Sequence, residues 1–352
     1  FLIHGESLCL QASMNGDNGS TPEPIEVFAV TEESRPLPLP AWQAVSARRS
    51  RRSLVLALVL FLLTVLSTLA VGAQFNLAYA RNQAPDFESF FLAYVEILHR
   101  PALLLAGIPF SFTLIGILLA HELGHFFACR YYGIAASYPY FLPAPTLIGT
   151  LGAFIRIRSP IVNRKALFDV GIAGPIVGFL FAAPALAIGI AFSKVVPEAE
   201  ANSAVIFGNP LLPRLLEAWL RPDAAPGDLL LHPIARAAWV GLFATALNLL
   251  PAGQLDGGHI LYSFASGWHR RISFAVAVLL VPLAYYCWAG WLPWAILLLL
   301  IGFRHPPLVD RWEPIDGRRR LWALIALLIF LLCFTPWPFE GQSLRMFLSD
   351  GG

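Results

Sequence analysis

The sequence predicts an all-α polytopic membrane protein with about seven transmembrane helices. A small membrane-embedded strand or loop element is expected between the second and third helices. Of 352 residues, 57% are hydrophobic and only 13% are charged, whereas about a quarter of the residues in soluble domains are charged. Several apolar runs reach the ~18 residues that indicate a membrane span. A net charge of +2 gives no reason to expect nucleic-acid binding.

The predicted spans follow the apolar runs in chain order. They cover 54–73, about 102–127, 167–193, 233–250, two short helices within 272–303, and 321–337. CWAGWLPW, with Gly290 and Pro293, suits an interfacial turn between the two short helices. Arginine and lysine gather in the segments that this layout assigns to the cytoplasm, including ARRSRRS before the first span. The distribution therefore predicts a cytoplasmic N-terminus.

The same patterns divide the chain into four segments. Residues 1–47 are Pro-rich and predict a flexible cytoplasmic tail, and 48–101 hold the first span and an outer amphipathic segment. Residues 102–310 form the transmembrane core, and 311–352 hold the last span and an outer tail. Because the first methionine is Met14, we expect residues 1–13 to precede the native start. With no transit peptide evident, the expected location is a bacterial inner membrane.

Three connecting segments differ from the spans. Residues 87–100 and 209–222 have apolar residues at helical spacing with charges between them, which predicts amphipathic helices on the outer surface. Residues 137–160 are apolar but rich in proline and glycine, including Gly149 and Gly152. This composition favours a strand pair or a re-entrant loop that is buried in protein or lines a cavity.

The sequence ILLAHELGHFFACRYYG, at 117–133, places polar groups inside an apolar helix. His121 and His125 are four residues apart, so both face one side of the helix and can bind one metal ion. Glu122 lies beside them, where a carboxylate can take a proton from a metal-bound water. The alternative is an ordinary helix end with histidines at the membrane interface and no function for Glu122. A carboxylate at membrane depth costs about 2.5–3.5 kcal/mol, which argues against this alternative.

A third ligand is offered by NLLPAGQLDGGH, at 248–259. Asp256 follows the cytoplasmic end of the fourth predicted span. His121 lies near the same depth, about 28 Å into the second span at 1.5 Å per residue. Asp-Gly-Gly is also typical of an ordinary turn. The matching depth favours a ligand, and two imidazoles with one carboxylate oxygen suit one zinc ion with an open position.

Taken together, HELGH, AGPIVG and NLLPAGQLDGG resemble the site-2 protease family of intramembrane zinc metalloproteases, over about residues 100–310. The segments from ACRYYGI to FDVGIAGP resemble its bacterial and plastid branch. The resemblance implies one Zn²⁺ per chain on His121, His125 and Asp256, with Glu122 as general base and acid. It also implies that Asn248 binds substrate or stabilises the transition state. Pro251, Gly149 and Gly152 are further candidates for substrate binding.

The resulting expectation is an endopeptidase that hydrolyses peptide bonds in or near the transmembrane helix of a membrane-anchored substrate. Such a helix must unwind locally, and the 137–160 segment could pair with it as an added strand. A metal-ion transporter is one alternative, but it would need polar residues in several consecutive spans. A catalytically silent membrane scaffold is another, and the intact Glu122 argues against it. Gly174 and Gly178 are expected to let helices approach closely.

Overall fold

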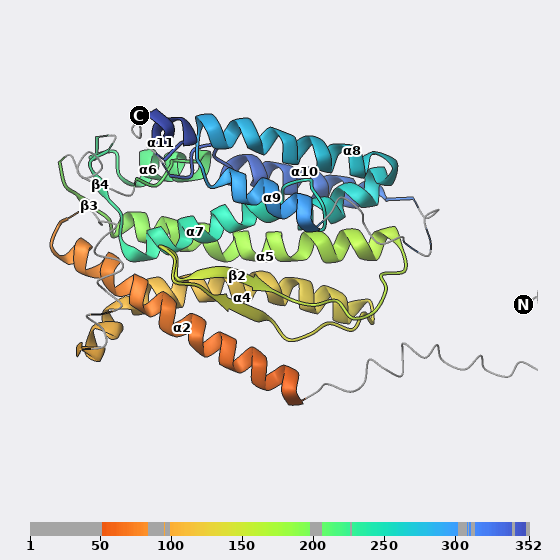
Figure 1. Ribbon diagram of the computed structural model, residues 1–352, viewed down its shortest axis with the longest axis horizontal. Coiled ribbons are helices and arrows are strands. Elements are labelled where there is room, and N and C mark those ends of the chain that lie inside the picture. Colours follow the sequence, from red (N-terminus) through yellow and green to blue (C-terminus); the bar gives the residue numbers. More distant parts are fainter. Residues whose placement is uncertain are drawn as a thin grey trace, which may run out of the picture. The chain divides into compact units, whose positions relative to one another are not determined.

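The computed structural model describes residues 51–83, 95, 99–197, 206–225, 227–301, 308, 310, 314–339 and 342–349. The predicted tail at 1–47, nearly all of the amphipathic segment at 87–100 and the start at 1–13 lie outside these residues. In chain order, the elements are α2 (Arg51–Ala80), η1 (Pro101–Gly107), α4 (Ile108–Tyr131), β1 (Tyr140–Pro143), β2 (Thr150–Phe154), α5 (Arg164–Ala191), β3 (Lys194–Val195), α6 (Leu211–Leu220), β4 (Leu229–Leu230), α7 (Pro233–Asn248), α8 (Asp256–Tyr286), α9 (Trp291–Ile301), α10 (Gly317–Cys333) and α11 (Leu344–Ser349) (Figure 1).

Three helical segments of the described chain are long and apolar enough to cross a membrane. They are Arg51–Ala80, Pro101–Tyr131 and Arg164–Ala191, and they coincide with the first three predicted spans. The mainly helical architecture and these segments define an integral membrane protein. Helices α7, α9 and α10 have 16, 11 and 17 residues, which is short of the ~18 residues used to identify a span. The number of seven spans therefore stays a prediction.

The helix ends follow local sequence signals. Asn163 caps α5 by accepting a 2.8 Å hydrogen bond from the backbone N–H of Ala166. Asp316 does the same for α10 with the N–H of Arg319, at 2.9 Å. Such caps satisfy backbone donors that have no partner within the helix. The predicted break near 287–294 is present, because α8 ends at Tyr286 and α9 begins at Trp291.

The start of α8 differs from the expectation. The sequence suggested two short helices within 272–303, but α8 begins at Asp256 and continues to Tyr286. Ala265 has non-helical backbone angles (φ −137°, ψ 59°), so α8 is kinked there. The polar first part of the helix hides its helical character from a search for apolar runs. Asp256 consequently belongs to the first turn of a helix rather than to an open loop.

The strand pair predicted within 137–160 is confirmed. β1 and β2 are antiparallel, with Tyr140 opposite Phe154 and Pro143 opposite Thr150. The hairpin rests on α2 through a 2.6 Å hydrogen bond from the Ser67 hydroxyl to the Gly149 carbonyl. Among the described residues, β2 pairs with β1 alone. The predicted helix at 209–222 is also present, as α6.

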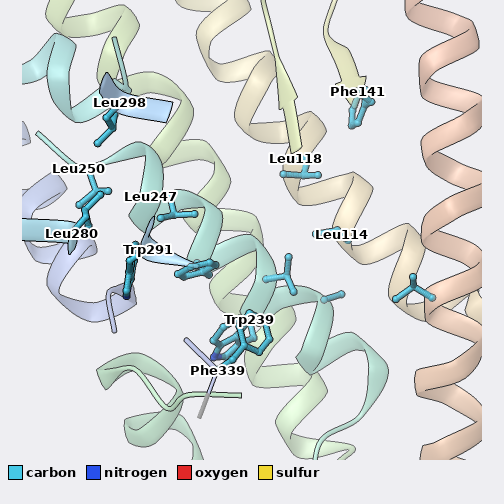
Figure 2. Close-up of a cluster of buried hydrophobic side chains, with 14 of the residues drawn as sticks. Leu114, Leu118, Phe141, Trp239, Leu247, Leu250, Leu280, Trp291, Leu298 and Phe339 are labelled. Carbon is cyan, nitrogen blue, oxygen red and sulfur yellow. The ribbon is translucent and has the colours of Figure 1, made fainter. Parts of the chain in front are cut away.

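A buried apolar cluster joins α4, α7, α8 and α9. It includes Leu114 and Leu118 from α4, Trp239 and Leu247 from α7, and Trp291 from α9 (Figure 2). A second cluster fills the space between α5, α7 and α10. The two clusters share α7, which packs against both α4 and α5. The polar side chains of His121 and Glu122 on α4 and of Asn248 on α7 are therefore held on helices whose apolar sides are already packed.

Candidate metal centre

Helix α4 carries two buried histidines on one face. His121 and His125 are one helical turn apart, and both are less than a tenth exposed. Their Nε2 atoms lie 3.1 Å apart, and their ring centroids lie 4.9 Å apart with the ring planes at 72°. Both imidazoles therefore direct the same nitrogen to one point.

Asp256 brings a carboxylate to that point from the first residue of α8. Asp256 Oδ2 lies 3.2 Å from His121 Nε2, and Asp256 Oδ1 lies 3.3 Å from His125 Nε2. Gly257 and Gly258 make this possible, because a Cβ at Gly257 would come within 2.1 Å of the Leu249 carbonyl oxygen. The first turn of α8 thus folds against the loop that leaves α7.

The loop before Asp256 is fixed at Gly253 by two side chains of α8. The Gly253 N–H donates to Ser273 Oγ at 3.1 Å. The Gly253 carbonyl accepts from His269 Nε2 at 3.0 Å. Both side chains are almost fully buried, so α8 fixes the loop that leads into its own first residue.

The donor atoms fit a zinc ion. Zinc binds imidazole nitrogen and carboxylate oxygen at about 2.0–2.1 Å, and a tetrahedral arrangement then separates neighbouring donors by about 3.3 Å. The two Nε2 atoms are 3.1 Å apart, and each lies 3.2–3.3 Å from one oxygen of Asp256, Oδ2 for His121 and Oδ1 for His125. These three residues form a group whose ligand atoms could hold one metal ion. Their chemistry and spacing leave a fourth position for another ligand.

Helix α5 sets the orientation of both rings. His125 Nδ1 lies 2.7 Å from the Val170 carbonyl oxygen, and because a carbonyl only accepts, Nδ1 carries the proton and Nε2 is left as a lone-pair donor. A Cβ at Gly174 would lie 2.1 Å from His125 Nε2, and one at Gly178 would lie 3.1 Å from His121 Nδ1. The two glycines of AGPIVG thus leave room for the imidazoles, in addition to the expected close helix packing.

A cavity of about 250 Å³ is lined by His121 and is bounded by α4, β2 and α7. Most of its lining is apolar, and its polar groups include Glu122, Asn248 and Thr150. Asn248 Nδ2 lies 3.3 Å from His121 Nε2. The backbone N–H of Ile155, just after β2, is near the Glu122 carboxylate. An acid, an amide donor and a possible metal ligand therefore share one mostly apolar space.

The substrate-binding candidates divide into two groups. Gly152 lines the cavity beside Asn248, whereas Gly149 and Pro251 are not among its lining residues. A Cβ at Gly149 would come within 2.8 Å of the Ser67 carbonyl oxygen, which places this glycine against α2. Sequence reasoning missed the carbonyl of Val170 and the side chain of Thr150. Neither has a motif signal, although Thr150 lies within the Pro/Gly-rich segment.

The membrane-length helices α4 and α5, together with the first residue of α8, surround two buried histidines and a carboxylate that could hold a metal ion. The family model of peptidase family M50 matches residues 109–287, a range that includes all of these donors. The chain therefore belongs to peptidase family M50, in agreement with the resemblance of its motifs to site-2 proteases.

Curated relatives extend the comparison beyond that range. The chain is 31% identical to "Probable zinc metalloprotease EGY1, chloroplastic" of Arabidopsis thaliana over 87% of its own length and 55% of the relative. The rice protein of the same name is 29% identical, over 87% and 52%. "Probable zinc metalloprotease EGY2, chloroplastic" of rice (subspecies indica) is 30% identical, over 70% and 46%. No solved structure matches.

These comparisons bear on length and location. The chain spans about half the length of the curated relatives it matches. The names of those relatives place them in chloroplasts, so they give no support to the predicted bacterial inner membrane. Three membrane-length helices support the coarser statement that the protein is an integral membrane protein.

Proposed function

We propose that this protein is an intramembrane zinc endopeptidase that cuts membrane-anchored proteins in or near a transmembrane helix. The observation that carries the proposal is the convergence of two imidazole nitrogens and the Asp256 carboxylate, with contacts of 3.1–3.3 Å between each pair of residues, beside a cavity that contains Glu122 and Asn248. Family membership and the printed names of the relatives support the same activity. In this proposal, His121, His125 and Asp256 hold one zinc ion per chain.

The residues around the cavity have separate roles in peptide hydrolysis. Zinc, when bound, supplies a Lewis acid and lets water ionise near neutral pH. The Glu122 carboxylate takes a proton from the attacking water and later gives it to the nitrogen of the leaving amine. The Asn248 side-chain N–H donates to the substrate carbonyl oxygen as negative charge develops there.

The substrate in this proposal is an apolar helix that unwinds locally. A helical peptide group is shielded by its own hydrogen bonds, so the reacting segment has to become extended. Among the described residues β2 is paired on one edge alone, by β1, and its Thr150 and Gly152 line the cavity. Pairing of the extended substrate with the other edge of β2 would replace the hydrogen bonds lost on unwinding.

The decisive experiment replaces Glu122 by Gln in the protein reconstituted into lipid vesicles. We expect the Glu122→Gln variant to bind one zinc ion per chain and to lose cleavage of a membrane-anchored test substrate. Glu217→Gln is the matched control, because Glu217 is a half-buried acid in α6 outside the cavity, bonded to Asn209 at 2.9 Å. Unchanged cleavage by Glu122→Gln would refute the role of this acid.

The transporter alternative has a separate signature in the same vesicles. Zinc flux across the bilayer that persists without cleavage would favour transport through the histidine and aspartate groups. Zinc binding with neither flux nor cleavage would favour a silent scaffold. Three further expectations stay predictions: the layout of about seven spans, the role of Pro251 and Gly149 in substrate binding, and the bacterial inner membrane. The chloroplast names of the relatives do not support the bacterial location.

A further inference from the structure

Three helices meet at a polar cluster just beyond the histidines. Tyr132 directly follows α4, Asp169 lies in α5, and Arg319 lies in the first turn of α10. The guanidinium group of Arg319 binds the Asp169 carboxylate in a bidentate manner, with Nε to Oδ1 at 2.9 Å and Nη2 to Oδ2 at 2.5 Å. The Tyr132 hydroxyl donates to the same carboxylate and accepts from Arg319 Nη2 at 3.2 Å.

This cluster is more specific in geometry and more buried than an ordinary surface ion pair. Bidentate arginine–carboxylate pairs are the geometrically specific kind, and the side chains of Arg319 and Asp169 are 18% and 29% exposed. Burial and the neighbouring Asp169 carboxylate raise the pKa of Tyr132 to about 12. The hydroxyl therefore stays protonated and keeps donating. Asp316 holds the other side of the guanidinium group through Arg319 Nη1, at 2.5 Å.

Asp169 directly precedes Val170, the residue whose carbonyl orients the proposed zinc ligand His125. The Val170 carbonyl oxygen lies 2.7 Å from His125 Nδ1. A rotation or shift of α5 at Asp169 would move that carbonyl and with it the direction of His125 Nε2. Partners that orient a ligating histidine are known to affect metal affinity.

We propose that Arg319, with Tyr132 and Asp169, forms a positioning clamp that fixes the Val170 carbonyl and thereby the zinc-binding direction of His125. The proposal rests on the proposed zinc centre. Its new content is that α10, which lies outside the residues matched by the family model, contributes to the metal site. Arg319 touches neither zinc nor substrate and acts through α5.

The test measures zinc affinity of the full chain in detergent by competition with a chelator. Removal of an orienting partner weakens metal binding about 10–100-fold, and because the clamp acts one step further out, we expect about 10-fold for Arg319→Gln and Asp169→Asn. The double variant should be no weaker than either single one. Arg319→Lys keeps the charge without the bidentate geometry and should restore only part of the affinity.

Two controls separate positioning from a general loss of stability. Arg320→Gln removes the same charge from an exposed position one residue along α10 and should leave zinc affinity unchanged. Ser193→Ala, just beyond the opposite end of α5, removes buried hydrogen bonds to Gly189 and His232. It should lower the thermal midpoint without weakening zinc. The visible spectrum of the cobalt(II)-loaded protein should change in Arg319→Gln and match that of the unaltered protein in both controls.

The outcomes distinguish the two proposals. If the unaltered protein binds no zinc, the proposed function fails. If it binds zinc and Arg319→Gln binds zinc equally well with the same cobalt spectrum, the clamp alone is refuted. If Arg319→Gln does not fold, Tyr132→Phe decides, because it removes one hydroxyl from the cluster. A smaller loss of affinity in the same direction supports the clamp, and unchanged affinity overturns it.

Discussion

The candidate metal centre has two contrasting walls. On the α5 side, a Cβ at Gly174 would clash with the His125 ring and one at Gly178 would lie tightly against the His121 ring, and the Val170 carbonyl fixes His125. The other wall belongs to a cavity of about 250 Å³ that is bounded by α4, β2 and α7 and to which α5 contributes no lining residue. The difference suggests that one wall holds the metal ligands rigidly, while the other admits and orients a substrate. Substitutions on the two walls should therefore affect different measurements.

The largest effect is expected on the cavity wall, at Asn248. We expect Asn248→Ala to lower kcat about 10²–10³-fold, as for other single donors to a developing oxyanion. Zinc affinity should change little, because the amide lies beside His121 without being one of the converging donors. Single-turnover cleavage and chelator competition on the same sample provide the check. Normal kcat, or equal losses of zinc and activity, would contradict the separation of the two walls.

The corresponding test of the α5 wall is Gly174→Ala. The added Cβ would lie 2.1 Å from His125 Nε2, so the ring has to move away from the other donors. A loss of about 10–100-fold in zinc affinity is the scale seen when ligand orientation is disturbed. Gly116→Ala on α4 is the matched control, because its Cβ would meet nothing within 4 Å. Equal zinc binding by the two variants would show that the wall is not rigid.

A smaller effect is expected where the hairpin rests on α2. Gly149 has φ +81°, and its added Cβ would lie 2.8 Å from the Ser67 carbonyl oxygen. Gly133 has φ +67° but open space around it. Alanine at either site costs about 1–2 kcal/mol in backbone strain. Only Gly149→Ala should also displace the hairpin and raise KM, and identical KM values for the two variants would argue against anchoring by α2.

The smallest effect concerns the start of α7, away from both walls. His232 caps α7 by accepting from the Ile234 N–H at 3.2 Å, and burial, with the charge of Lys194, lowers the pKa of His232 below its ordinary value. Because the unfolded chain binds the proton more readily, this contribution is present above the ordinary pKa of about 6.5. It is lost as pH falls through that value towards the folded pKa.

A thermal denaturation series between pH 5 and pH 8 tests this cap. We expect the unaltered protein to lose about 1 kcal/mol, the usual scale of a capping bond, on acidification. His232→Asn keeps an acceptor that does not titrate in this range, so its stability should depend less on pH. An identical pH dependence in both proteins would exclude His232 as the titrating cap.

The sequence supports the site better than it supports the span count. Helical spacing fixes His121 relative to His125, and equal depth in two helices brings Asp256 near them, as observed in the structure. The number of spans is weaker, because α7, α9 and α10 are short and packing rather than hydropathy decides their ends. Hydropathy also fails to show the start of α8, because the first part of this helix is polar.

Contacts between residues far apart in the chain could not be predicted from one sequence. Gly149 and Gly152 both have positive φ and lie in the same segment, yet one rests on α2 and the other lines the cavity. Only the packing of the hairpin distinguishes them. Arg319 and Asp169 are separated by 150 residues, and no local pattern marks them as partners. Tertiary packing therefore supplies the surroundings of the site, while local spacing supplies its donors.

The central claim is that His121, His125 and Asp256 bind one metal ion together. X-ray absorption spectroscopy of the zinc-loaded full chain tests it most directly, with Asp256→Ala as the comparison. The account predicts one zinc ion per chain in a four-coordinate site with two imidazoles and oxygen ligands, and a loss of that site in Asp256→Ala. Protein that cannot bind zinc, or zinc bound by sulfur in both proteins, would contradict it.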